Sequence, residues 1–155
     1  MKWQLIIFLV LLTAGLASCA KKPGRYANEP YIEYKGRWPD SIRSGSGEDT
    51  VFISFRFTDG DADLGNDASS GNYDIFATDS RDATLYSYLF PNIPDQIRNP
   101  EKGMEGTCTF YILAAFLTLR PDHPDADTVS FSIYIKDRAG NQSNTIQTDP
   151  VYIVP

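Results

Sequence analysis

The fold is constrained first by the strongly alternating pattern of residues 50–58, in which every second residue is apolar, and by the acidic run that follows at once. Val51, Ile53, Phe55 and Phe57 occupy every second position of this segment. Successive side chains of a β-strand point to opposite faces, whereas a helix would scatter such residues around its axis. The segment therefore predicts a strand with one face in a hydrophobic core.

The acidic run after this strand predicts a site for a hard cation. Its carboxylates stand mostly at alternating positions, with two glycines among them: Asp59, Asp61, Asp63 and Asp67. Ca²⁺ takes about six to eight oxygen ligands in flexible geometry, and these residues match four ligand positions of an EF-hand-style loop. Leu64 and Ser70 stand where that loop needs glycine and glutamate, so further ligands must come from elsewhere. The alternative is a solvated acidic turn, in which Asp and Gly serve turn geometry only.

Six further segments have strand patterns or strand-like composition, and turn residues separate them. With residues 50–58 the predicted strands are 30–34, 50–58, 73–78, 84–90, 107–119, 128–136 and 145–154. The segment 107–119 is long and apolar enough for a buried helix, but its threonine and aromatic content favours a central or bulged strand. Seven strands with regularly spaced turns and no amphipathic helix predict an all-β fold, a seven-stranded antiparallel β-sandwich.

The turn after residues 128–136 resembles one found in bacterial immunoglobulin-like domains. Residues 137–143 (DRAGNQS) fit the Asp-x-Ala-Gly-Asn-x-Ser pattern between the last two strands of such domains. The strand order is similar to the A, B, C, C′, E, F, G order of immunoglobulin-like and fibronectin type III-like sandwiches. The chain also resembles small lipoproteins of Bacteroidetes-type bacteria, which share its leader, its acidic loop and this turn. That resemblance implies no known activity.

The sandwich topology supplies a source for the missing cation ligands. In such a fold the loop 59–72 and the turn 137–141 lie at the same end. Asp137 and Asn141 are therefore expected to meet Asp59, Asp61 and Asp63 and to complete a structural Ca²⁺ site. The alternative for Asp137 and Asn141 is that they only cap and tighten their own turn.

The N-terminus has the pattern of a lipoprotein leader. Residues 1–18 combine Lys2 with a short apolar stretch over residues 5–12, which is too short for a stable membrane span. Residues 16–19 (LASC) resemble the bacterial lipobox, which implies that Cys19 is the lipidated first residue. Residues 19–29 then form a tether and residues 30–155 the sandwich domain. By resemblance, Ala20 after the cysteine favours the outer membrane, and the following lysines favour its periplasmic side.

The net charge of the chain and its lack of catalytic motifs limit the classes of function that we expect. A net charge of −6 disfavours binding to nucleic acid and leaves protein or glycan partners open. No nucleophile motif or phosphate-binding loop is present, so no catalytic residue is assigned and an enzyme is not expected. A hydrolase that needs only paired carboxylates stays a remote alternative. His123 is the single histidine and cannot build a zinc site, and Cys108 is expected to be an inert, half-buried thiol.

One aromatic strip is a candidate ligand surface. Tyr86, Tyr88 and Phe90 alternate with other residues over 84–90, so on an outward strand face they could stack on sugars or on a protein. The alternative is packing across the strands. The sequence thus predicts a lipid-anchored, calcium-stabilised module for protein or glycan binding or for spacing in the cell envelope. A carbohydrate-handling accessory lipoprotein that uses this strip is the second hypothesis.

Overall fold

Ten β-strands make up the fold within residues 26–91, 93–94, 96 and 98–155, which the computed structural model describes. They are β1 (Tyr31–Trp38), β2 (Ser41–Arg43), β3 (Thr50–Asp59), β4 (Ile75–Asp79), β5 (Leu85–Tyr88), β6 (Met104–Leu113), β7 (Asp127–Val129), β8 (Phe131–Ile135), β9 (Ile146–Gln147) and β10 (Val151–Val154). No α-helix occurs in this part of the chain, so the expected all-β class is confirmed.

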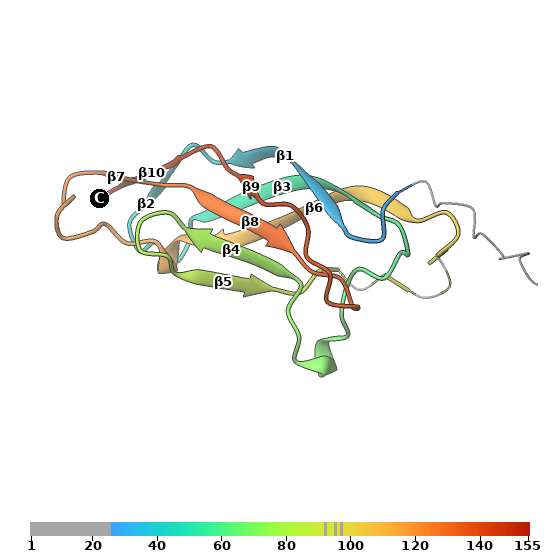
Figure 1. Ribbon diagram of the computed structural model, residues 1–155. Coiled ribbons are helices and arrows are strands. Elements are labelled where there is room, and N and C mark those ends of the chain that lie inside the picture. Colours follow the sequence, from blue (N-terminus) through green and yellow to red (C-terminus); the bar gives the residue numbers. More distant parts are fainter. Residues whose placement is uncertain (1–25, 92, 95, 97) are drawn as a thin grey trace, which may run out of the picture.

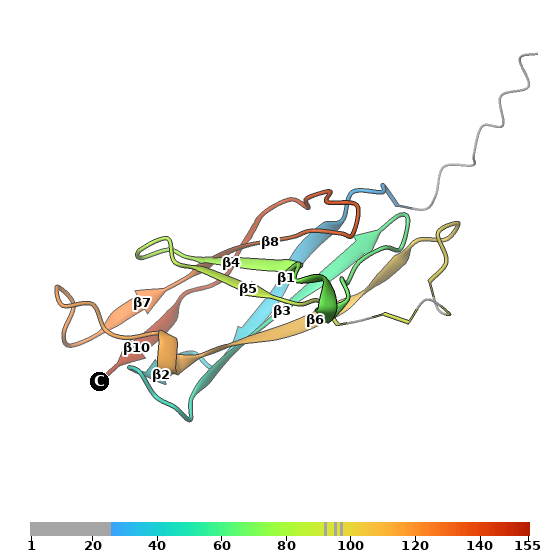
Figure 2. The ribbon, with the colours of Figure 1, turned by 90° about the horizontal axis from the view of Figure 1, so that it is seen from below.

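The strands form three sheets that are arranged as a sandwich (Figure 1). One layer has the order β1-β3-β6, and the other has the order β5-β4-β8-β9. A small third sheet, β2-β10-β7, closes one end of the molecule. Neighbouring strands are antiparallel, except that β2 and β10 run parallel. Figure 2 shows the same two layers from below, with β4, β5 and β8 lying over one face of β1, β3 and β6.

The hydrophobic core fills the space between these layers. The predicted inward residues of β3, Val51, Ile53, Phe55 and Phe57, are all buried, and this prediction is confirmed. Aromatic rings join the two layers at 5.2 Å between the centroids of Tyr88 and Phe110. Such contacts bury apolar surface at roughly 25 cal/mol per Å², so the inward faces of both sheets supply most of the stabilisation.

The strand count differs from the predicted seven for local reasons. The predicted strand 128–136 is interrupted at Ser130 into β7 and β8, and the predicted strand 145–154 is interrupted before Val151 into β9 and β10. Pro150 lies in the second break, where it cannot donate a ladder hydrogen bond. The short strand β2 was not expected from the sequence.

The ambiguous segment 107–119 is a strand and not a helix. It forms most of β6 and ends in a 3₁₀ turn at Ala114–Phe116. Among the described strands β6 pairs only with β3, so it lies at a sheet edge, whereas a central or bulged strand was expected. Cys108 on its inner face is buried and not half-buried, and burial raises the pKa of its thiol to about 12, which leaves it unreactive.

A buried ion network lies at the end of the sandwich opposite the acidic loop. The Arg81 guanidinium donates to Asp79 at 2.7 Å and to Asp127 at 3.3 Å, and Arg120 donates to Asp127 at 2.8 Å. Asp127, the first residue of β7, is buried because these two arginines enclose it.

The predicted signal peptide 1–18, Cys19 and most of the tether lie outside the described residues. Among the residues that are described, no helix has the length and apolarity needed to cross a membrane.

Candidate metal centre

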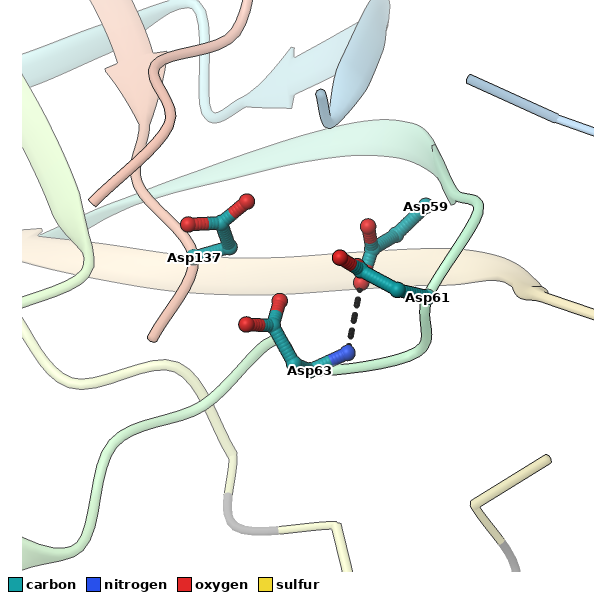
Figure 3. Close-up of side chains that lie close together, drawn as sticks. All are labelled: Asp59, Asp61, Asp63 and Asp137. Atoms are coloured by element: carbon teal, nitrogen blue, oxygen red, sulfur yellow. Dashed lines mark hydrogen bonds between the residues drawn. The ribbon is translucent and has the colours of Figure 1, made fainter. Parts of the chain in front are cut away.

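Four carboxylates gather where β3 and β8 end (Figure 3). Asp59 is the last residue of β3, Asp61 and Asp63 follow it in the loop, and Asp137 comes just after β8. One oxygen of each lies within 4.8 Å of one oxygen of every other member. We call these four residues the acidic cluster. The structure thus brings together the acidic loop and the turn 137–141, which are distant in sequence.

The loop after β3 is shaped by Asp59 itself. Its Oδ2 atom accepts hydrogen bonds from the backbone N–H of Asp63 at 2.9 Å and of Leu64 at 3.3 Å. Ala62 takes a left-handed conformation with φ 59°, and Leu64 is fully buried in the core. The chain therefore folds back over Asp59, and this turn directs the side chains of Asp61 and Asp63 toward it.

Two arginines hold this loop from outside the cluster. Arg98 donates to the carbonyl oxygens of Ala62 at 2.8 Å and Leu64 at 2.9 Å, and Arg138 donates to the carbonyl of Gly65 at 2.7 Å. Charged donors make stronger hydrogen bonds than neutral ones, so these contacts fix the loop backbone. No sequence pattern singles out Arg98, which lies in the irregular segment between β5 and β6.

The second loop orients Asp137. Asn141 donates to both of its carboxylate oxygens, from the backbone N–H at 2.7 Å and from Nδ2 at 2.8 Å. The backbone N–H of Ala139 donates to Asp63 Oδ2 at 3.0 Å and joins the two loops directly. These two bonds fit the alternative interpretation, in which Asn141 tightens the turn that holds Asp137, while its expected role as a cation ligand stays a prediction.

Several buried oxygens of the acidic cluster have no hydrogen-bond partner. They are Oδ1 of Asp59, Asp61 and Asp63. Asp59 is fully buried, and Figure 3 shows its carboxylate facing those of Asp61 and Asp63. Nearly all buried polar atoms in folded proteins have a partner, and each exception needs an explanation. A cation among these oxygens would supply it.

The raised pKa values of two members of the acidic cluster also favour a cation among these carboxylates. Burial, followed by the charge on Asp61, raises the pKa of Asp59 from 3.8 to about 7. Burial, followed by the charges on Asp137 and Asp61, raises the pKa of Asp63 from 3.8 to about 6. The cluster is therefore costly to ionise near neutral pH without a cation. All of these donors are carboxylate oxygens, which suit a hard ion such as Ca²⁺ and not a soft metal.

Asp67 lies outside the acidic cluster, although the sequence grouped it there. It caps the 3₁₀ turn Ala68–Ser70, and its Oδ1 atom accepts hydrogen bonds from the N–H of Ser69 at 2.8 Å and from the Ser69 hydroxyl at 2.6 Å. These bonds lower the pKa of its carboxyl, so Asp67 has a local role in the turn. The buried Leu64 separates it from the cluster, because the chain enters the core there and leaves in a new direction.

The predicted ligand strip also differs from expectation. Phe90 is buried, while Tyr86 and Tyr88 are partly buried against the core, with Tyr86 next to Phe131 and Tyr88 next to Phe110. The alternation is correct, but the exposed face holds Leu85 and Leu89. The alternative interpretation, packing across the strands, describes these aromatics.

Gly60 packs the start of the domain against the acidic loop. A Cβ atom at this position would lie 2.4 Å from the carbonyl oxygen of Ala27 and 2.5 Å from that of Tyr26. Gly60→Ala is therefore expected to lower the free energy of unfolding by about 1–3 kcal/mol in urea denaturation, because the backbone must shift. Gly47→Ala is the matched control, since a Cβ there meets nothing within 4 Å. Equal effects of the two substitutions would contradict this packing.

Comparison with known proteins assigns no family. No protein-family model matches the chain, and no curated protein does. Among solved structures, a Niemann-Pick type C2 protein from Japanese carpenter ant is similar over 87% of this chain and 96% of that chain, with 14% sequence identity and a TM-score of 0.41. At that TM-score the likeness supports no conclusion about this protein.

Proposed function

We propose that this protein is a lipid-anchored β-sandwich module of the bacterial cell envelope, stabilised by one Ca²⁺ ion and without catalytic activity. It binds a protein or glycan, or spaces a larger assembly, on the periplasmic side of the outer membrane. The observation that best supports the cation is the buried Asp59 carboxylate, whose unpartnered Oδ1 faces the other members of the acidic cluster. The lipobox-like residues 16–19 support the anchor.

The ion is proposed to be structural. Asp59 and Asp137 are buried and belong to different loops, so an ion between them would join the ends of β3 and β8. Residues 26 and 27 contact Gly60 beside this cluster, and Figure 1 shows the N-terminal segment at the same end of the sandwich. A cation there would brace the end of the domain at which the tether joins it.

The finer fold assignment is an immunoglobulin-like or fibronectin type III-like arrangement. If β1 and β2 count as strand A, β7 and β8 as F, and β9 and β10 as G, seven strands remain. The sheet orders then read A-B-E and C′-C-F-G, with β2 parallel to β10. This pattern supports the seven-stranded order expected from the sequence.

Thermal melting with and without calcium tests the proposal. With Ca²⁺ at a hundred times its Kd, the folded state gains about 2.7 kcal/mol, which corresponds to a rise in Tm of roughly 10 °C for a domain of this size. Asp61→Asn is expected to abolish most of this rise, because it removes a carboxylate that faces the ion.

Asp67→Asn provides the matched control in the same loop. Its side chain bonds only locally to Ser69 in the described contacts, so the calcium-dependent rise is expected to persist. Identical melting curves in calcium and in chelator would overturn the cation proposal. A rise that survives in Asp61→Asn would place the ion elsewhere.

A further inference from the structure

Three aromatic side chains form an exposed row on the outer face of the β1-β3-β6 sheet. Trp38, Phe52 and Tyr111 are cross-strand partners and are 67%, 39% and 54% exposed. The ring centroids of Trp38 and Phe52 lie 5.9 Å apart with an angle of 30° between the planes, and those of Phe52 and Tyr111 lie 6.4 Å apart. We call these three residues the aromatic row.

The row differs from the rest of the same sheet face. The hydroxyls of the next cross-strand pair, Ser54 and Thr109, lie 2.7 Å apart. Beyond it Arg56 forms an ion pair with Glu105, which lies diagonally across the strands. The middle of this outer face is therefore polar, whereas one end holds the aromatic row and the other end holds Tyr31, which is 51% exposed. A contiguous exposed apolar patch with a polar surround is typical of a binding surface.

A pocket of about 470 Å³ adjoins the aromatic row. Trp38, Phe52, Pro39 and Ile42 form its apolar side, and Arg43, Glu48 and Asp49 form its polar side. Ligand sites combine a mostly apolar wall with a few polar groups that set orientation, and this volume lies within their usual range.

Hydrogen bonds link the residues of the polar wall to one another. Arg43 donates to the two carboxylate oxygens of Asp49, each at 3.1 Å, and to Glu48 at 3.2 Å. The hydroxyl of Ser46 accepts the backbone N–H groups of Glu48 and Asp49, each at 3.1 Å. The fork-like contact with Arg43 lowers the pKa of Asp49.

We propose that the aromatic row and this pocket bind a neutral polysaccharide. A pyranose ring has an apolar face of C–H groups that packs on a flat aromatic ring, while its hydroxyls need acceptors and donors at the side. Trp38 supplies a widely exposed ring at the edge of the pocket, and the Arg43–Asp49 pair supplies both kinds of polar group.

Charge excludes the main alternatives among polymers. The pocket has one guanidinium against the two carboxylates of Glu48 and Asp49, and the whole chain has a net charge of −6. Anionic polysaccharides and nucleic acids would be repelled by this balance. A neutral glycan carries no such penalty, and its many hydroxyls match the polar wall.

This inference specifies the partner of the envelope module and rests on that proposal only for its place outside the cell. The residues are separate from the acidic cluster. Phe52 and Asp59 both lie on β3, and at a rise of about 3.3 Å per residue they are roughly 23 Å apart. A failure of glycan binding and a failure of calcium binding can therefore be told apart.

Affinity electrophoresis of the purified full-length protein in detergent tests the inference. Native gels contain mixed-linkage β-glucan, galactomannan, xylan or amylopectin, with polygalacturonate as the anionic comparison. We expect at least one neutral polymer to retard the wild type and polygalacturonate not to do so. Trp38→Ala and Phe52→Ala are each expected to weaken the Kd for that polymer at least about tenfold.

Two controls separate binding from folding. Tyr73→Ala removes a tyrosine that is 53% exposed. It lies in the loop before β4, which belongs to the other sheet, so this substitution is expected to leave retardation unchanged. Asp61→Asn is expected to change the calcium response but not the retardation. Each variant is used at a temperature below its measured Tm.

Three results would overturn the inference. The first is no retardation of the wild type by any of the four neutral polymers. The second is retardation that Trp38→Ala and Phe52→Ala leave unchanged. The third is a wild-type dimer that Trp38→Ala converts to a monomer in size-exclusion chromatography, because a second copy of the chain would then cover the row.

Discussion

Arg81→Met is expected to lower the free energy of unfolding by about 3–5 kcal/mol, because it removes one partner of a buried ion network. The Arg81 side chain is 7% exposed and lies against Asp79 and Asp127, which are 0% and 2% exposed. Asp127 would keep Arg120, but Asp79 would retain only the backbone N–H of residue 81 among these contacts. Urea denaturation with a fitted midpoint and slope measures the loss.

Arg43→Met provides the matched control for this network. Arg43 also makes a two-pronged contact with an aspartate, but its side chain is 57% exposed. Exposed pairs contribute about 0–1 kcal/mol, so the loss is expected to be small. A loss at Arg81 no larger than that at Arg43 would mean that the buried network does not stabilise the fold.

In chelator the protein is expected to become less stable as pH rises from about 4 to about 7. Asp59 and Asp63 have pKa values of about 7 and about 6 in the folded state, against 3.8 otherwise. In this window the folded state binds more protons than the unfolded state, so the free energy of unfolding falls as pH increases. The carboxyls with lowered pKa values, Asp49, Asp67, Asp82 and Asp127, have the opposite effect, which ends by about pH 5, so the decrease in stability is clearest between about pH 5 and pH 7.

The variant Asp59→Asn provides a second test of this pH dependence of stability. The amide oxygen can still accept from the backbone of Asp63 and Leu64, while the charge that is costly to bury is gone. The variant is expected to melt several degrees above the wild type in chelator at pH 8, with a flatter pH profile and little response to calcium. Wild-type stability that increases from pH 5 to pH 8 in chelator would contradict the assigned electrostatics.

The fold class was predictable because the core patterns are local. The inward residues of β3 and the alternation Val129, Phe131, Ile133 and Ile135 place one side of each strand in the core, and all of these side chains are buried. Strand breaks were less predictable, since Ser130 interrupts pairing without changing the alternation. Whether β6 is central or at an edge depends on sheet neighbours that no local pattern specifies.

The candidate site was predictable only in part. Spacing singled out Asp59, Asp61 and Asp63, and the topology of the expected sandwich placed Asp137 near them. Asp67 was grouped with them because a sequence count cannot show that Leu64 turns the chain into the core. The contacts of Arg98 with the loop carbonyls depend on the path of a long irregular segment. That segment has no hydrophobic periodicity or motif from which its path could be predicted.

The aromatic residues show a further limit of strand patterns. Alternation put Tyr86, Tyr88 and Phe90 on one face of a strand, but it does not say which face is buried. They pack inward, while Trp38, Phe52 and Tyr111, which belong to three different strands, become neighbours only when the sheet forms. A surface built from cross-strand pairs is therefore visible only in the structure.

Isothermal titration calorimetry with Ca²⁺ at pH 8 measures binding of the ion to the protein itself. We expect one calcium ion per chain to bind to the wild type and to Asp67→Asn, and we expect Asp61→Asn to lose that binding. Absence of binding to the folded wild type, or equal binding to Asp61→Asn, would contradict the assignment of the acidic cluster as a calcium site.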